Sequence, residues 1–287
     1  SVGGDKTLDE HVTLANVLKK FNPNLYGYSI GTGSADAWAK AKLNAGIPGA
    51  HADELYGQAQ DLVRRIKEHP EIDYMNKWKL IHVFIGSNDM CHYCSEPDTE
   101  APEKFRDYVK SSIQYLKDSL PKTIVVLTSM FDMSMLRSID KGQVFCQGLH
   151  LFECKCESDE AFTDEQIHNA SKLYMAREKE LQDSGIFDTT DDFTLVIQPY
   201  LNDQRKPPLD ANGNPNLEFF AADCFHFSQL GHAMVAKNLW NNLIQPVGGK
   251  RTTAELNDQS YKLECPEKSC PFVRTTKNSI DCSKYMT

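Results

Sequence analysis

The order of apolar and polar positions along the chain predicts alternating helices and strands. A period of about 3.6 residues marks amphipathic helices, and short continuous apolar runs mark buried strands. The predicted helices span residues 8–21, 52–68, 103–120, 163–183 and 229–244. The predicted strands span residues 80–85, 123–127 and 193–198, with a further extended stretch at 26–30. This alternation is what a doubly wound α/β sheet requires.

Local signals set the ends of the longest predicted helix. Thr163 is placed as its N-cap, Gln166 completes a capping box, and Gly185 follows as the stop. Between the strand at 123–127 and this helix, the sequence predicts a loop that carries three cysteines. A second loop, rich in Pro, Asn and Asp, is predicted at 199–215.

Length and charge limit the function classes. The 287 residues can bury one large core, and we expect one domain at 1–246 followed by a polar, cysteine-containing tail at 247–287 that packs on it. A net charge of -9 argues against nucleic acid as a partner, because no basic stripe is available for phosphates. No apolar run approaches the roughly 18 residues of a spanning helix, so we expect no transmembrane segment.

Nine cysteines, in a chain that begins with Ser1, indicate a processed protein of an oxidising compartment, and secretion is the expected location. Because nine is odd, at least one thiol is free or bonded outside the chain. The sequon at Asn169 is a glycosylation candidate that fits secretion, although such tripeptides also occur by chance.

Two cysteine spacings leave chemical alternatives. Cys91 and Cys94 have the spacing of a redox motif, but nothing nearby resembles a thioredoxin unit, so structural disulfides are favoured. Cys154 and Cys156, with Cys146, suggest zinc, but one intervening residue suits a tetrahedral site poorly. We therefore assign no metal and no cofactor.

The segment Asp223-Cys-Phe-His226 has the spacing of an acid/base pair. A short turn there lets Asp223 orient the His226 ring while the opposite nitrogen faces a serine hydroxyl. The alternative is a plain surface turn before a helix capped by Ser228. Its position between a late loop and the C-terminal helix favours the catalytic interpretation.

Two upstream turns offer donors for an oxyanion. The sequence GSND follows an apolar strand, which places Asn88 at the carboxyl end of the sheet, and its neighbour Asp89 is expected to tie down the loop. In NAGIPGA, at 44–50, glycines permit positive φ and Pro48 stiffens the turn, so the N–H of Gly49 can point into a cleft. Taken singly, each is also just a good turn sequence.

Together, and in this order, these three motifs resemble the later conserved blocks of the SGNH (GDSL) hydrolases. The surrounding sequence is similar to that of the phospholipase B branch of this family. The resemblance covers nearly the whole chain, and its segments include HVTLANVLKKFNP, WKLIHVFIGSNDMCHYC, DDFTLVIQPY, FFAADCFHFS and LWNNLIQPVG. It implies a three-layer α/β/α sandwich with a mainly parallel, flavodoxin-like sheet. It also implies hydrolysis of lipid esters without metal or cofactor.

Carried over residue by residue, the resemblance makes Gly49 and Asn88 oxyanion donors, His226 the general base and Asp223 its orienting partner. His232 matches a histidine often seen in the following helix and receives no catalytic role.

The chain departs from this family at the G-D-S block, which carries the nucleophile and follows the first strand. No Gly-Asp-Ser occurs among the 287 residues. The segment Gly27–Gly31 fits G-x-S-x-G, but too few strands precede Ser29 and a Gly- and Ser-rich loop follows it, so we reject it as a nucleophile elbow.

The leading hypothesis is therefore a secreted phospholipase B-like ester hydrolase, present as the larger fragment of a processed precursor. A second peptide would supply the first strand and the serine, held by strand pairing, with the odd cysteine as a covalent link. The alternative is an inactive protein of the same fold that binds or carries a hydrophobic ligand.

Overall fold

Three parallel strands form the centre of the protein in the computed structural model, which describes residues 1–286. The strands are β1 (Lys79–Val83), β2 (Thr123–Thr128) and β3 (Phe193–Gln198), hydrogen-bonded in the order β1-β2-β3. The central strand β2 has only one residue that is not fully buried, and β3 has none. The continuous apolar runs in the sequence are therefore covered on both faces, as parallel sheets require.

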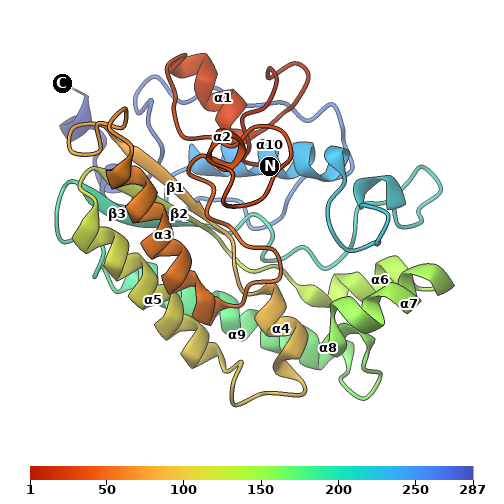
Figure 1. Cartoon of the computed structure of the whole chain (residues 1–287). Helices are drawn as coiled ribbons and strands as arrows, with labels where there is room; N and C mark the ends of the chain where they lie inside the picture. The colour runs from red at the N-terminus through yellow and green to blue at the C-terminus, as the bar shows by residue number, and fades with distance from the viewer. Residues whose placement is uncertain (287) are drawn as a thin grey trace.

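Helices cover the two faces of this sheet. The helices α1 (Leu14–Phe21) and α10 (Gln229–Leu243) contact each other on one face, and α3 (Leu55–Glu68), α5 (Pro102–Ser119) and α9 (Asp164–Asp183) pack side by side on the other (Figure 1). This is the three-layer α/β/α arrangement that the sequence predicts.

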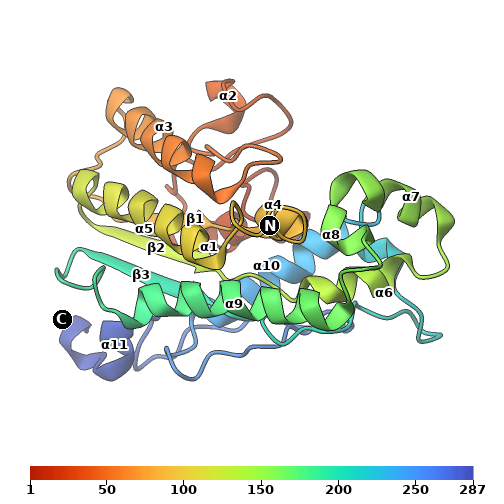
Figure 2. The same ribbon diagram turned by 90° about the horizontal axis from the view of Figure 1, so that it is seen from below.

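Shorter elements complete the described chain. They are α2 (Trp38–Ala41), α4 (Ser87–Tyr93), α6 (Leu136–Asp140), α7 (Val144–Glu153), α8 (Lys155–Ser158), α11 (Thr276–Ile280) and four 3₁₀ turns at 52–54, 133–135, 217–219 and 283–285. Both views show α4, α6, α7 and α8 gathered beyond one end of the sheet (Figures 1 and 2). That end is the carboxyl end, since α4 follows β1 and α6 follows β2.

The capping chemistry of α9 is confirmed. The Thr163 hydroxyl accepts from the Gln166 N–H at 3.3 Å, and the Gln166 side chain accepts from the Thr163 N–H at 2.8 Å. Gly185 follows with φ of 68°, a left-handed conformation that glycine adopts without strain. These reciprocal bonds satisfy N–H groups that the first turn leaves unpaired, which fixes where α9 begins.

Three sequence expectations were wrong in detail. The first helix begins at Leu14 rather than near residue 8, because Thr13 caps it by accepting from the Asn16 N–H. The stretch 26–30 forms no strand, because its backbone makes isolated bonds instead of a ladder. The predicted cysteine loop after β2 instead contains a 3₁₀ turn and the helices α6, α7 and α8, which are too short for periodicity to reveal.

Disulfides hold these short helices in place. Cys91 and Cys94 of the α4 region pair with Cys154 and Cys156, so both are structural half-cystines, as the sequence favours. A third disulfide joins Cys146 of α7 to Cys224. A fourth joins Cys270 to Cys282 and leaves Cys265 free and exposed, which accounts for the odd count.

The segment after residue 246 contacts α10 through its backbone. The indole N–H of Trp240 donates to the Glu264 carbonyl at 2.8 Å, and the Asn241 amide donates to the Lys262 carbonyl at 2.9 Å. None of the helices in residues 1–286 has the length and apolar character needed to cross a bilayer.

The two outer strands of the sheet differ in burial. Every residue of β3 is buried, whereas four of the five residues of β1 are only half-buried. Within residues 1–286, β1 pairs with β2 along one edge and with no strand along the other. β3 likewise pairs only with β2, so both outer strands have a free edge, and the edge strand with half-buried residues is β1.

Candidate active site

A cavity of about 300 Å³ lies at the carboxyl ends of the three strands. Residues that follow each strand contribute to its wall, namely Phe84 to Ser87 after β1, Phe131 after β2, and Tyr200 with Leu201 after β3. The cavity also includes Asn88 and His226, which the sequence analysis assigns to catalysis. The remaining wall is largely apolar, with Ile47, Met135, Leu136, Phe220, Phe225, Phe227, Val235 and Leu239 among its side chains.

Asp223 and His226 form a hydrogen-bonded pair in the turn between the 3₁₀ turn at 217–219 and α10. The Asp223 Oδ2 atom lies 2.9 Å from His226 Nδ1, and Asp223 Oδ1 accepts from the backbone N–H groups of Phe225 and His226, each at 3.0 Å. The His226 side chain is 68% exposed. Asp223 therefore fixes the orientation of an imidazole that solvent and substrate can reach.

The charge of Asp223 is maintained by its hydrogen bonds. Partial burial alone would raise the pKa of this carboxyl, but the N–H of Phe225 and the ring and backbone of His226 together hold the pKa below its usual value. Asp223 is thus an anion at neutral pH, the state that orients a general base.

The turn itself is braced on both sides. Phe220 and Phe227 form an antiparallel bridge across it, and Cys224 at its tip adopts a left-handed φ of 62°. The disulfide from Cys224 to Cys146 ties the same tip to α7.

Asn88 lies in the first turn of α4, beside the 44–50 loop. Its Nδ2 group donates one hydrogen bond to the Ala50 carbonyl at 2.9 Å, which leaves the second N–H of this amide for another acceptor. Gly49 has φ of 78° and is exposed; its neighbour Ala50 lines the cavity, while Gly49 itself is not among the lining residues. The structure therefore brings Asn88 and His226 to one cavity and places Gly49 at its margin.

Gly86, which precedes α4, is required by its surroundings. Its φ is 110°, and a Cβ atom there would lie 2.8 Å from the Phe105 ring and 2.9 Å from the Met130 sulfur. Only glycine allows the chain to turn from β1 into α4 at this point.

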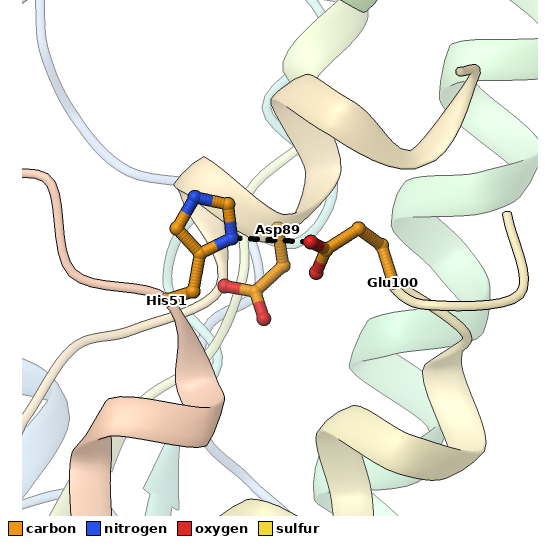
Figure 3. A group of neighbouring side chains, drawn as sticks. All are labelled: His51, Asp89 and Glu100. Atoms are coloured by element: carbon orange, nitrogen blue, oxygen red, sulfur yellow. Dashed lines mark ion pairs between the residues drawn. The ribbon is translucent and has the colours of Figure 1, made fainter. Parts of the chain in front are cut away.

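Asp89 reaches beyond its own loop, which the sequence predicts that it ties down, and bonds to the segment that follows the 44–50 loop. Its buried carboxylate accepts from the Ala52 N–H at 3.0 and 3.2 Å. His51 pairs with Glu100 at 3.3 Å beside it, so the three side chains point toward one another from three different segments (Figure 3). Burial raises the pKa of the Asp89 carboxyl and that of the Glu100 carboxyl.

Residues 2–239 match the family described as GDSL-like Lipase/Acylhydrolase. The chain belongs to the GDSL family. It is 35% identical to "Phospholipase B1, membrane-associated" of Mus musculus and of Rattus norvegicus, and 34% identical to that of Homo sapiens. Each alignment covers 97% of this chain and 19% of the relative, so the chain spans about a fifth of the length of these relatives. No solved structure matches the chain significantly.

Membership of the GDSL family makes the serine hydroxyls near His226 important to locate. Ser1 and Ser87 line the cavity; the Ser1 hydroxyl lies 3.0 Å from His232 Nδ1, and the Ser87 hydroxyl faces the Met130 sulfur at 4.0 Å. Ser29 is not among the lining residues, and no helix follows it directly. Among residues 1–286, no serine hydroxyl makes a hydrogen bond to the His226 ring.

Sequence reasoning missed two polar groups of this candidate site. Glu153, at the end of α7, is half-buried near the Asp223–His226 pair, and its pKa is raised by burial and by the charge of Asp223. His82 of β1 lines the cavity and bonds to the Thr128 hydroxyl at 2.9 Å; burial lowers its pKa to about 4. No local motif marks either residue, because both reach the site only through the tertiary fold.

Three groups of His and carboxylate side chains in residues 1–286 have ligand atoms close enough to hold a metal ion. In each group these atoms lie within 4.8 Å of one another; the groups are His51 with Asp89 and Glu100, Asp140 with His150 and Glu157, and Glu153 with Asp223 and His226.

Proposed function

We propose that this protein is a phospholipase B-like serine ester hydrolase that acts on lipid esters. The observation that carries the proposal is the meeting of the Asp223–His226 pair with Asn88 on one largely apolar cavity, in a chain of the GDSL family. An apolar wall suits acyl chains, and the polar groups gather where an ester carbonyl would react.

The hydrogen bonds support a role for each residue in this proposal. Asp223 holds Nδ1 of His226, so Nε2 takes the proton of the attacking serine and later returns it to the leaving alcohol. The second N–H of Asn88 and the N–H of Gly49 would stabilise the oxyanion, with Ala50 fixing the Asn88 amide through its carbonyl.

We propose that the nucleophilic serine comes from outside these 287 residues, on a second peptide of the same precursor. The half-buried residues of β1 and the free edge of that strand support this, because an additional parallel strand can pair there. A turn at the carboxyl end of such a strand would reach the same end of the sheet as Asn88.

The test is to map the serine that reacts with a fluorophosphonate probe in protein from its natural source. We expect labelling of a serine in a Gly-Asp-Ser sequence outside the 287 residues, and we expect p-nitrophenyl ester hydrolysis to stop in proportion to labelling. Labelling of Ser1, Ser29 or Ser87 that removes activity would contradict the external nucleophile while leaving hydrolysis standing.

The second candidate is an inactive carrier of a hydrophobic ligand, which the apolar cavity and the lack of Gly-Asp-Ser in the chain both favour. Neither labelling nor hydrolysis, combined with retention of a fatty acid or lysolipid after purification, would select this function over the hydrolase.

We further propose that the protein is secreted as a processed glycoprotein, since four disulfides fit an oxidising compartment. The candidate acceptor Asn169 is exposed on α9, but Ser171 of the same sequon is buried and bonds to the Ile167 carbonyl. Any glycan would therefore have to be added before α9 folds. A mass shift on deglycosylation of the native protein tests this.

A further inference from the structure

Asp140, His150 and Glu157 form a buried cluster outside the candidate active site. They come from the end of α6, from α7 and from α8, three short helices that lie beyond one end of the sheet. The His150 side chain is fully buried, and the side chains of Glu157 and Asp140 are 2% and 14% exposed. Three ionisable side chains meet in an interior where each isolated charge would be costly.

Hydrogen bonds do not account for this cluster. Neither ring nitrogen of His150 has a hydrogen-bond partner in residues 1–286. Its Nδ1 atom lies 3.3 Å from Glu157 Oε2 and 3.6 Å from Asp140 Oδ2, without the alignment of a hydrogen bond to either. A buried imidazole whose two ring nitrogens make no hydrogen bond needs an explanation, because such groups are almost always satisfied.

The cluster needs protons or a cation to be neutral. With neutral His150, two carboxylates share the site, and without a cation the charges cancel only when two protons bind, for example to His150 and to one of the two carboxyls. The nearby Arg137 is engaged elsewhere, since it pairs with Asp164 and donates to the carbonyls of Cys156, Glu157 and Asp159. A dication with a neutral imidazole would leave the cluster uncharged.

Two of the three spacings between ligand atoms fit tetrahedral coordination, and the third, between the two carboxylates, is within 4.8 Å. Zinc binds His nitrogen and carboxylate oxygen at about 2.0–2.1 Å, so neighbouring ligand atoms of a tetrahedron lie roughly 3.3–3.4 Å apart. The two distances from His150 Nδ1 fall at or near this value, and both carboxylates face the same ring nitrogen. Ser158 donates to Glu157 Oε2 at 3.2 Å and so orients that carboxylate, as outer partners of metal ligands do.

We propose that Asp140, His150 and Glu157 bind one Zn²⁺ ion, with water as the fourth ligand. The ion joins α6, α7 and α8 and thereby steadies the catalytic turn, because α7 is tied to Cys224 by a disulfide and the His150 ring lies against Phe225 with ring centres 5.6 Å apart. The site does not depend on whether the protein hydrolyses esters.

One competing arrangement outside the Asp223–His226 pair is the His51, Asp89 and Glu100 group. There the Asp89 carboxylate already accepts two contacts from the Ala52 N–H, and His51 and Glu100 border an open cavity of about 360 Å³. His51→Gln is therefore the matched control for His150→Gln, since each change removes one imidazole from one candidate group.

The experiment strips the purified protein with a chelator and titrates Zn²⁺ by calorimetry, with Co²⁺ absorption as a report on tetrahedral geometry. We expect one equivalent in the wild type and in His51→Gln. We expect an affinity loss in His150→Gln larger than the roughly 10- to 100-fold that removal of an outer partner costs. Zn²⁺ should also raise the melting temperature of the wild type but not of His150→Gln.

Circular dichroism establishes that each variant is folded. If His150→Gln does not fold, the near-isosteric changes Glu157→Gln and Asp140→Asn take its place with the same expected loss. A wild type that binds no Zn²⁺, undiminished binding in the cluster variants, or loss confined to His51→Gln would overturn the proposal. The first of these outcomes would identify the cluster as a buried ion pair that holds only a proton.

Discussion

At the level of single residues, His226 is held through Nδ1 by Asp223 and exposes the rest of its ring. We expect His226→Ala to lower kcat/KM for a short-chain p-nitrophenyl ester by about 10⁴-fold or more, because the members of a triad act as a unit. Asp223→Asn should cost nearly as much by favouring the wrong tautomer. Steady-state kinetics on the ester-hydrolysing form of the protein measure both.

A matched control exists within the chain. His168 of α9 also has its Nδ1 atom paired with an aspartate, Asp132, at 2.6 Å, but it does not line the cavity. His168→Gln should therefore retain activity in the fraction that folds. Equal turnover by the wild type and His226→Ala would remove His226 from the mechanism.

Asn88 should have both a catalytic and a structural effect. Loss of one oxyanion donor costs roughly a hundredfold in kcat, which we expect for Asn88→Ala. The same change removes the bond to the Ala50 carbonyl, so the free energy of unfolding should fall by about 1 kcal/mol. Turnover and urea denaturation separate the two effects. A rise in KM at constant kcat would instead make Asn88 a residue of ground-state binding.

Which site residues the sequence could predict depended on how far apart they lie in the sequence. Asp223 and His226 are three residues apart, so a single turn creates their contact and the motif is readable locally. Glu153 and His82 enter the same region from α7 and β1, and only the packing of those elements brings them there. Nothing in their immediate sequence distinguishes them from other polar residues.

At the level of elements, α9 is joined to the end of β2 by a buried carboxyl. Glu178 is fully buried and accepts from the Ser129 hydroxyl and the Met130 N–H, and burial raises its pKa from 4.5 to about 8. The folded protein keeps this proton up to about pH 8, whereas the unfolded chain releases it above pH 4.5. Stability from this group is therefore fully present below pH 4.5 and is lost as pH rises to 8.

We expect the free energy of unfolding to include a decline of up to about 1.4 kcal/mol per pH unit across this window from Glu178 alone. Glu178→Gln keeps the shape and removes the titration, so it should flatten that part of the profile. The exposed Glu180→Gln on the same helix is the control and should leave the slope in place. Chemical denaturation at several pH values measures it, and an unchanged slope in Glu178→Gln would contradict the assignment.

Helices and strands could be predicted where a hydrophobic period repeats several times and a capping motif marks the end. Helix α9 has 20 residues with a capping box at its start, so periodicity and caps agree. The helices between β2 and α9 have 4 to 10 residues, and three disulfides to distant parts of the chain hold them. Their stability arises from cross-links and tertiary contacts, which periodicity does not record.

At the level of the whole molecule, the free edge of β1 is where a further parallel strand could extend the sheet. In a parallel strand, alternate N–H and C=O groups point to opposite sides, so β1 turns one row toward β2 and the other away from it. A buried polar group without a partner costs about 1–3 kcal/mol, and several such groups would approach the 5–15 kcal/mol stability of a typical domain. A strand that pairs with this edge would satisfy those outward groups of the half-buried β1 that water does not reach, and would thereby stabilise the sheet.

Hydrogen exchange measures this directly. In the 287-residue chain alone, we expect the outward amides of β1 to exchange far faster than those of β2, which has a neighbour on both sides. In protein that contains the Gly-Asp-Ser segment, the same β1 amides should become protected, while those of β2, the internal control, should change little. Protection of β1 that is equal to that of β2 in the isolated chain, and unchanged by the segment, would show that no strand is added at this edge. The nucleophile would then have to reach His226 by another route, and the carrier function would become the better explanation of the apolar cavity.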